Sequence, residues 1–143
     1  MSDKEIEIRL DLKIDEHGFF YTNMDISKND LSKTAYNCKV IIDTGASTSL
    51  IKPHLAENIN IIRYGETNIS NPLSLERERT NAYEVNLSND LIMIPKLKCI
   101  EMKDLLYPAD FLIGINVIKH YDFHWDSLNK NAYMVFRNKN HDV

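Results

Sequence analysis

The residues best placed to do chemistry are Asp43, Thr44 and Gly45, which directly follow the apolar run Val40–Ile42. The apolar run predicts a buried strand, and threonine with glycine predicts a turn immediately after it. A carboxylate brought to the edge of a core costs stability unless something uses it, so Asp43 is a candidate acid or base. An Asp-initiated turn at a strand end is the simpler interpretation, and the rest of the chain must decide between the two.

A second glycine holds a similar position late in the chain. Gly114 ends the apolar run Phe111–Ile113 and precedes a predicted short helix over 116–121, which Asn116 is suited to cap. The chain contains only 4 glycines, against about ten expected from average usage. We therefore expect the backbone to need glycine at Gly45 and Gly114, through positive φ or close approach of another segment. Taken alone, the late segment is equally typical of a buried strand that reaches a turn.

Length and composition favour one domain over residues 1–143. The net charge of −4 gives no indication of a nucleic-acid or anionic-membrane partner. The polar first residues do not resemble a signal peptide, and no apolar run is long enough to cross a bilayer. Cys38 and Cys99 are isolated in apolar stretches, so we expect buried free thiols, a reducing compartment and a cytoplasmic location.

Many short strands separated by turns are predicted along the chain. Residues Ile6–Ile14 alternate between apolar and charged, which predicts a half-buried strand, and the turn Asp15–Gly18 joins it to a second strand over Phe19–Ile26. Further strands are predicted over 36–42, 83–87, 91–94, 97–100, 111–114 and 132–136, and one or two helical turns over 53–58. This pattern predicts an all-β barrel or sandwich.

Other chemistry receives less support from the sequence. His120 and His124 are four residues apart without the glutamate of a zinc-protease motif, and the segment around Phe123 and Trp125 favours a packed turn, so we expect no metal. The serines after Gly45 lack the glycine pattern of a serine hydrolase. The alternating charges of 76–79 favour a solvated loop or exposed hairpin over a site for acidic substrates.

Together, the two glycine segments resemble the aspartic protease family. Residues 41–47 are similar to the active-site loop, and residues 112–114 with 116–118 are similar to the apolar–apolar–glycine strand and short helix that follow later. Their order and separation resemble single-lobe, retropepsin-like members over roughly residues 36–136. The resemblance implies a closed acid-protease β-barrel lobe with one short helix near the C-terminus. The strand pair over 5–26 is then an extension that widens a dimer interface or caps a sheet edge.

The resemblance also implies the reaction. The family hydrolyses peptide bonds with two carboxylates that share one proton, so that the pair is acid and base at once. This chain has only one Asp-Thr-Gly, and a two-lobed enzyme needs about twice its length. The resemblance therefore implies a twofold homodimer in which Asp43 of both subunits activates water. Such an enzyme takes a peptide or protein substrate, needs no cofactor and works best at acidic or near-neutral pH.

Roles for the neighbouring residues follow from the same resemblance. Thr44 would hydrogen-bond across the twofold axis, and Gly45 would let the loop approach the substrate. Ala46 and Ser47 would line the cleft beside the substrate backbone. Support from behind the loop would come from two residues of the late segment, Gly114 and Asn116.

The region expected to close over the substrate departs from the family pattern. Flap hairpins of the family are usually glycine-rich at the tip, whereas residues 63–83 contain a single glycine, Gly65. We expect the tip at 68–72, where Asn71 and Pro72 favour a turn. This departure keeps an alternative open, namely a non-catalytic dimerisation or peptide-binding module with the same fold.

Overall fold

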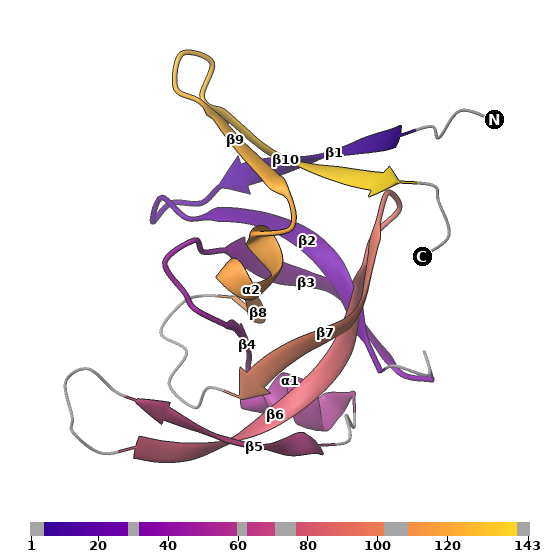
Figure 1. Cartoon of the computed structure of the whole chain (residues 1–143), viewed down its shortest axis with the longest axis vertical. Helices are drawn as coiled ribbons and strands as arrows, with labels where there is room; N and C mark the ends of the chain where they lie inside the picture. Colours follow the sequence, from indigo (N-terminus) through magenta and orange to yellow (C-terminus); the bar gives the residue numbers. More distant parts are fainter. Residues whose placement is uncertain (1–4, 29–31, 60–62, 71–76, 102–108, 140–143) are drawn as a thin grey trace.

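The structure, a computed structural model, describes residues 5–28, 32–59, 63–70, 77–101 and 109–139 (Figure 1). Strands dominate these residues, as the sequence predicts. The strands are β1 (Glu5–Ile14), β2 (Phe20–Ser27), β3 (Thr34–Ile42), β4 (Ser49–Ile51), β5 (Arg63–Ser70), β6 (Arg77–Ser88), β7 (Met93–Glu101), β8 (Phe111–Ile113), β9 (Asp122–Asp126) and β10 (Asn131–Lys139). The described helices are α1 (Pro53–Asn58) and α2 (Ile115–Ile118).

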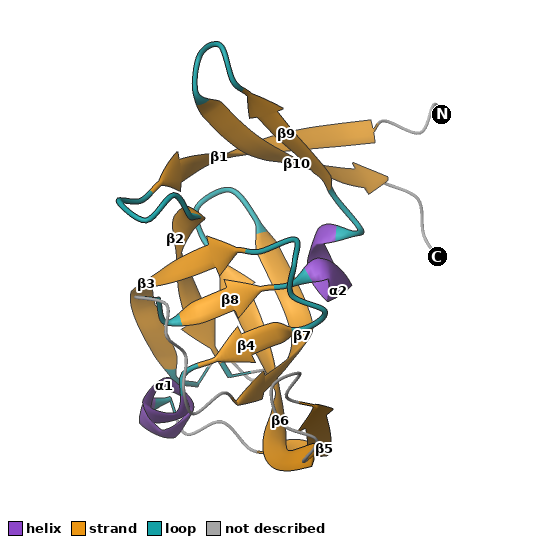
Figure 2. Ribbon diagram, turned by 90° about the vertical axis from the view of Figure 1, so that its left-hand side faces the viewer, coloured by secondary structure: helices purple, strands orange, loops and turns teal. Residues whose placement is uncertain are grey.

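Six strands close into a barrel in the order β6-β7-β4-β8-β3-β2. The ring is completed by β2, which pairs back to β6 with Ile26 opposite Leu87. Closure removes the free edges that would otherwise need cover. Strand β5 pairs with β6 outside the ring, and Figure 2 shows the barrel beneath a separate group of strands. The predicted all-β closed barrel with a short helix near the C-terminus is therefore confirmed.

Strand β8 lies between β3 and β4, which are consecutive strands of the barrel wall in sequence. It runs parallel to β3, with Leu112 opposite Ile41, and antiparallel to β4, with Leu112 opposite Leu50. Residues 43–48 must therefore loop around the end of β8 to connect β3 with β4. This arrangement brings the two glycine segments of the sequence into contact.

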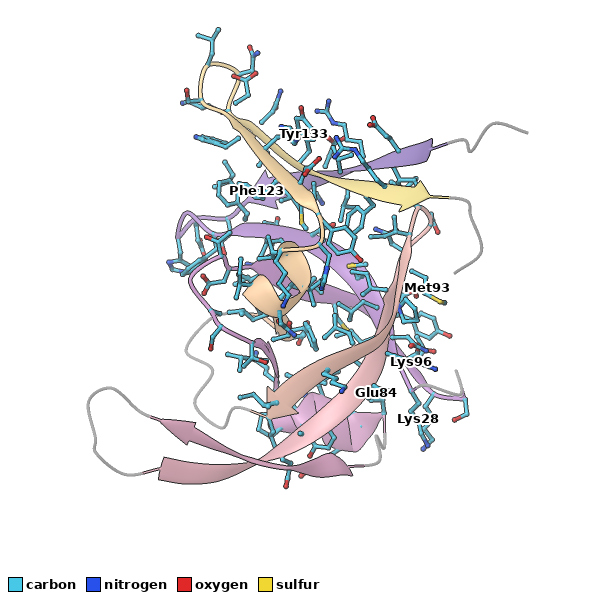
Figure 3. All side chains as sticks on the ribbon, in the orientation of Figure 1. Lys28, Glu84, Met93, Lys96, Phe123 and Tyr133 are labelled. Atoms are coloured by element: carbon cyan, nitrogen blue, oxygen red, sulfur yellow. The ribbon has the colours of Figure 1, made fainter. Side chains whose placement is uncertain are left out.

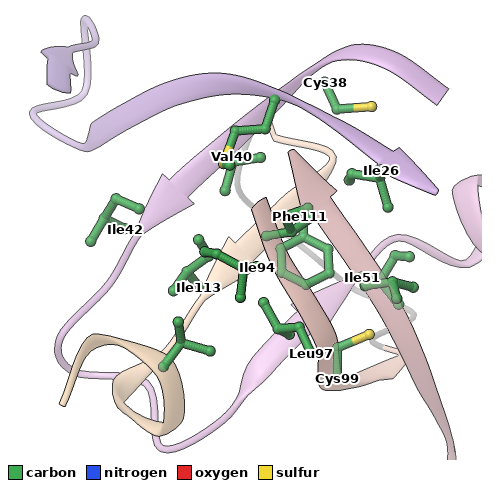
Figure 4. Close-up of a cluster of buried hydrophobic side chains, with 14 of the residues drawn as sticks. Ile26, Cys38, Val40, Ile42, Ile51, Ile94, Leu97, Cys99, Phe111 and Ile113 are labelled. Carbon is green, nitrogen blue, oxygen red and sulfur yellow. The ribbon is translucent and has the colours of Figure 1, made fainter. Parts of the chain in front are cut away.

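The wall formed by β3, β8 and β4 is buried on both faces. Neighbouring strand residues point to opposite faces, and Ile42 packs in the cluster inside the barrel whereas Ile41 packs in a second cluster. Figure 4 shows the inner cluster, which includes Val40 and Phe111. The second group, called the outer cluster below, consists of Ile41, Leu50, Ile100, Ala109 and Leu112. Burial on both faces explains why the apolar runs here are continuous.

Strands β1, β10 and β9 form a three-stranded group, called the terminal sheet below. Strand β1 pairs with β10 from Glu5–Lys139 to Leu12–Ala132, whereas its described pairs with barrel strand β2 are limited to Lys13–Tyr21 and Ile14–Phe20. The inward face of the terminal sheet adds Leu10 and Leu12 from β1 and Met134 from β10 to the inner cluster.

Residues 122–126 form strand β9, so the predicted packed turn around Phe123 and Trp125 is wrong. The sequence Asp-Phe-His-Trp-Asp alternates aromatic with polar side chains, which is the period of a strand. The alternation was hidden because the run is short and its aromatic residues suggested a turn packed on the core.

Asp15 fixes the turn at which the terminal sheet meets the barrel. Its Oδ1 accepts the N–H groups of His17 and Phe19, and its Oδ2 accepts Nζ of Lys39 at 2.9 Å. The Lys39 ammonium also lies 4.6 Å from the centre of the Tyr21 ring. Burial alone raises the pKa of Asp15, but the hydrogen bonds from Phe19, Lys39 and His17 outweigh it and lower that pKa below its usual value.

Strand β7 is continuous where two strands were predicted over 91–94 and 97–100. The β6–β7 register shifts between Val85 and Leu87, and Lys96 adopts φ 52. The Lys96 N–H donates to Oδ1 of Asn86 at 2.9 Å. A bulge thus absorbs the residues next to Pro95 without ending the strand, which the sequence pattern could not distinguish from a turn.

The β5–β6 hairpin corresponds to the predicted flap region. Asn68 pairs with Arg79 and Ser70 with Arg77, so the predicted tip at 68–72 begins too early. Residues 71 and 72 of that prediction lie outside the described residues. Residues 77–79 lie in the hairpin strand β6, so a hairpin rather than a loop holds this part of the alternating charges.

Both cysteines are free and buried, as predicted. Burial raises the pKa of Cys38 to about 11, with a further contribution from the negative charges of Asp110 and Asp25. Burial also raises the pKa of Cys99. Each thiol packs in the inner cluster (Figure 4) and stays protonated at neutral pH.

Candidate active site

Asp43 begins the loop that connects β3 to β4. Its N–H donates to the carbonyl of Ile113 at 2.9 Å, which continues the β3–β8 pairing by one bond beyond the strand. Its carbonyl accepts the N–H of Ala46 at 3.3 Å, which closes the turn. The backbone of Asp43 is thus held on both sides, and its side chain is partly exposed at the end of the wall.

The carboxylate of Asp43 is oriented by its own loop. The N–H of Gly45 donates to Oδ1 at 2.8 Å. A Cβ atom added at Gly45 would lie 3.2 Å from that same oxygen, so a side chain there would press on the carboxylate. Glycine therefore allows the loop to fold tightly enough for the N–H to reach Asp43, and close approach rather than positive φ explains its use.

Gly114 brings the second segment against the back of the loop. A Cβ atom at this position would lie 2.4 Å from the carbonyl oxygen of Thr48 and 2.9 Å from that of Ala46. The N–H of the next residue, Ile115, donates to the Ala46 carbonyl at 2.8 Å. The backbones of the two segments touch here, as the expectation of close approach requires, and this contact fixes the position of the loop relative to β8.

Ser49 joins the same contact with its side chain. Its buried Oγ accepts the N–H of Gly114 at 3.1 Å and donates to Oδ1 of Asn116 at 2.9 Å. Nδ2 of Asn116 donates to the carbonyl of Lys98 on β7 at 3.2 Å. A chain of hydrogen bonds therefore runs from β7 through α2 to the first residue of β4.

The expected capping role of Asn116 is wrong. The N-cap of α2 is Gly114, no side chain caps the helix, and Asn116 lies inside it at the second position. Its amide is used instead to link Ser49 with β7. Sequence reasoning missed Ser49, although a small hydroxyl beside the apolar run of β4 was a usable signal, because buried hydroxyls almost always have partners.

The loop meets apolar surface on its other side. Ala46 packs against the outer cluster, which includes Ile41 two residues before Asp43. Thr44, Gly45 and Ser47 are exposed on the loop. The predicted site residues are therefore brought together in one place, with a carboxylate, exposed loop backbone and apolar side chains within a few residues of one another.

A further polar group lies at the root of the β5–β6 hairpin. The Tyr83 hydroxyl donates to Oε2 of Glu101 at 2.7 Å, and Nδ2 of Asn81 donates to the same oxygen at 2.9 Å. Burial raises the pKa of Tyr83 to about 12, helped by the hydrogen bond to Glu101 and its charge. These bonds tie β6 to β7 where the hairpin leaves the barrel.

The described part of the chain lacks the features of a metal site and of a membrane-spanning helix. No group of three or more His, Cys, Asp or Glu side chains there is arranged to hold a metal ion. None of the described helices has the length and apolar character that crossing a membrane requires.

Comparison with known proteins gives the class of fold. No family model and no curated protein matches the sequence. Among solved structures, the chain is similar to a retropepsin-like aspartic protease from Rickettsia conorii, with a TM-score of 0.63 and 13% identity over 96% of this chain and 97% of that one. It also matches the retroviral protease-like domain of Ddi1 from Leishmania major, with a TM-score of 0.46 and 15% identity over 86% and 98% of the two chains.

The likeness to the Rickettsia structure spans nearly the whole of both chains, so this protein has a retropepsin-like fold. The resemblance seen in the sequence is confirmed at the level of the fold. Identity this low carries no residue roles from one protein to the other, so the roles of Asp43 and its neighbours must be argued from their own chemistry.

Proposed function

We propose that this chain is an aspartic endopeptidase that acts as a homodimer on peptide or protein substrates. The observation that supports it best is the setting of Asp43. Its carboxylate is oriented by the Gly45 N–H, partly exposed, and placed on a loop that β8 and α2 clamp from behind. Peptide hydrolysis without a metal or covalent intermediate needs positioned acid and base groups, and a carboxylate held in this way can serve as one of them.

One such carboxylate supplies only half of the acid–base pair that the reaction requires. One group must take a proton from water while another gives a proton to the leaving nitrogen. Two carboxylates a hydrogen bond apart do both, because they cannot both ionise and so share one proton. A twofold axis beside Asp43 supplies the second carboxylate from the partner subunit. The shared proton then places the activity optimum at acidic or near-neutral pH.

The neighbouring residues take roles that fit their positions. Thr44, exposed at the tip of the turn, bonds across the axis to the partner loop, and Gly45 presents backbone to the substrate. Ala46 and Ser47 line the cleft beside the substrate backbone. Two residues position the loop without touching the substrate: Gly114 and Asn116.

Cleavage of a complex peptide mixture tests the function. Wild type and the variants Asp43→Asn and Asp90→Asn are incubated across acidic and neutral pH, and new termini are identified by mass spectrometry. Asp90 is exposed in the β6–β7 turn and serves as the matched control. We expect Asp90→Asn to cleave like wild type and Asp43→Asn to lose at least about a hundredfold in rate, while light scattering shows the same dimer for all three proteins.

The possible results separate the hypotheses. If Asp43→Asn cuts as well as wild type, the mechanism is wrong. If wild type forms a dimer but yields no new termini at any pH, the non-catalytic binding module replaces the enzyme. If wild type is a strict monomer under all conditions, the chain has no second carboxylate and the proposed reaction fails.

A further inference from the structure

An exposed apolar group lies where the terminal sheet meets the barrel. Trp125 on β9 is 45% exposed and Ile14 on β1 is 42% exposed. Phe20 lies between them, because it pairs with Ile14 in the β1–β2 ladder and its ring centre is 5.4 Å from that of Trp125 and 5.3 Å from that of Phe123. These four residues, Ile14, Phe20, Phe123 and Trp125, are called the β9 patch below.

The patch borders an open strand edge. β9 is the last strand of its sheet and, among the described residues, pairs only with β10. The outward N–H and C=O groups of such an edge are available to another strand. An apolar patch beside an open edge offers a partner both side-chain contacts and backbone hydrogen bonds.

The patch lies close to the candidate active site. Phe20 lies opposite Ile42 in the β2–β3 ladder, and Ile42 directly precedes Asp43. Figure 1 shows β9 and the loop between β3 and β4 on the same side of the molecule, the left of the view. A second copy that approaches Asp43 along a twofold axis therefore comes to β9 as well.

We propose that β9 pairs antiparallel with β9 of a second copy, and that this contact buries the β9 patch in the homodimer. The inference rests on the proposed function, because the single carboxylate is what requires a second copy at this side. A twofold contact joins a surface to itself, and same-face residues of an antiparallel pair lie side by side, so the aromatic residues of β9 contact those of its copy across the new strand pair. Large aromatic residues are enriched in the buried centres of interfaces.

The charged residues of β9 do not oppose this pairing. Asp122 forms an ion pair with Arg137 of the same chain. Asp126 accepts the N–H groups of Leu128 and Asn129 and the side-chain amide of Asn129, and these bonds lower its pKa below the usual value. Asp122 therefore has a cationic partner in its own chain, and the carboxylate oxygens of Asp126 are hydrogen-bonded in their own turn before a second copy arrives.

Dimer affinity of Trp125→Glu tests the proposal. The dissociation constant is measured by sedimentation over a dilution series of the full chain, with Met93→Glu as the matched control. Met93 is 52% exposed, and Figure 3 shows it on the opposite side of the molecule from Phe123. We expect Trp125→Glu to weaken the dimer by about thirtyfold or more, as for a central aromatic contact, and Met93→Glu to change it by less than about twofold.

A second measurement separates dimerisation from folding. Circular dichroism and thermal unfolding are recorded for each variant, and Trp125→Glu is also made in a tandem protein with two copies joined by a flexible linker. Tethering raises the effective concentration of the partner. We therefore expect the tandem variant to recover cleavage activity, whereas a misfolded subunit would stay inactive.

The outcomes distinguish this inference from the proposed function. A Trp125→Glu protein that dimerises as tightly as wild type, a Met93→Glu protein equally weakened, or a monomeric wild type overturns the interface. A wild-type dimer that Trp125→Glu weakens, but that cleaves nothing, supports the interface and removes the protease. Cleavage by a dimer insensitive to position 125 supports the protease and removes the interface.

Discussion

The wall around Asp43 and the terminal sheet are joined to the rest of the barrel by different means. At the wall, the backbones of the loop and of Gly114 touch, and Ser49 and Asn116 add side-chain hydrogen bonds that reach β7. The terminal sheet meets the barrel through two ladder pairs with β2 and through apolar packing. The wall is thus completed within one chain, whereas the sheet keeps an open edge at β9 that a second chain can complete.

Gly114→Ala should disrupt the wall and cause the largest loss in the free energy of unfolding among these variants. The new Cβ would lie 2.4 Å from the Thr48 carbonyl oxygen, so backbone must move apart. We expect a loss of about 3 kcal/mol or more in the free energy of unfolding, measured by chemical denaturation. Gly18→Ala is the control, because Gly18 has φ +84 and open space around it, and it should cost only about 1 kcal/mol. Equal losses for the two variants would contradict the steric account.

Ser49→Ala should weaken the wall without a clash. It leaves the Gly114 N–H and Oδ1 of Asn116 without their hydroxyl partner, which costs about 1–3 kcal/mol. Ser27 is the matched control, since it is equally buried but its Oγ has no hydrogen-bond partner among the described residues. We expect Ser27→Ala to be nearly neutral in chemical denaturation, and a comparable loss there would show that Ser49 stabilises through packing alone.

Asp15→Asn tests the junction between the two regions. Because the folded-state pKa of Asp15 is lowered, its contribution is present above the unfolded-state pKa and is lost as pH falls through the folded-state value. The melting temperature of the variant should therefore be below that of wild type at neutral pH, and the gap should close below about pH 4. A gap that stays constant into acid would mean that the hydrogen-bond geometry, not the charge, stabilises the turn.

Glu7→Gln should have the smallest effect, because it changes only the outer face of the terminal sheet. Glu7 accepts Nε of Arg137 at 3.2 Å, and both side chains are largely exposed. Exposed ion pairs of this kind contribute about 0–1 kcal/mol. We expect a change within about 0.5 kcal/mol in chemical denaturation. A loss as large as that of Ser49→Ala would remove the contrast between sheet and wall.

The strands with strong alternation or continuous apolar runs could be predicted from the sequence. Strand β1 alternates cleanly, and Val40–Ile42 with Phe111–Ile113 are apolar throughout because the wall is buried on both faces. The need for glycine at Gly45 and Gly114 could also be predicted from the scarcity of glycine. At these positions the local sequence pattern and the backbone geometry of the fold favour the same structure.

Features that depend on tertiary partners could not be predicted. The continuity of β7 past Pro95 depends on the Asn86 side chain, which is ten residues from Lys96 in sequence. The place of Asn116 depends on Ser49 and Lys98, which lie far from it along the chain. Strand β9 is short and polar at every second position, so its pairing with β10 decides its structure.

The placement of the two cysteines has a practical consequence. Cys38 and Cys99 come from strands on different parts of the ring, and both sulfur atoms lie inside it, protonated and shielded. A thiol reagent reaches either one only when the surrounding strands separate. The rate at which each cysteine is labelled therefore reports how often its part of the barrel opens, and a comparison of the two rates shows whether the ring opens as a unit or strand by strand.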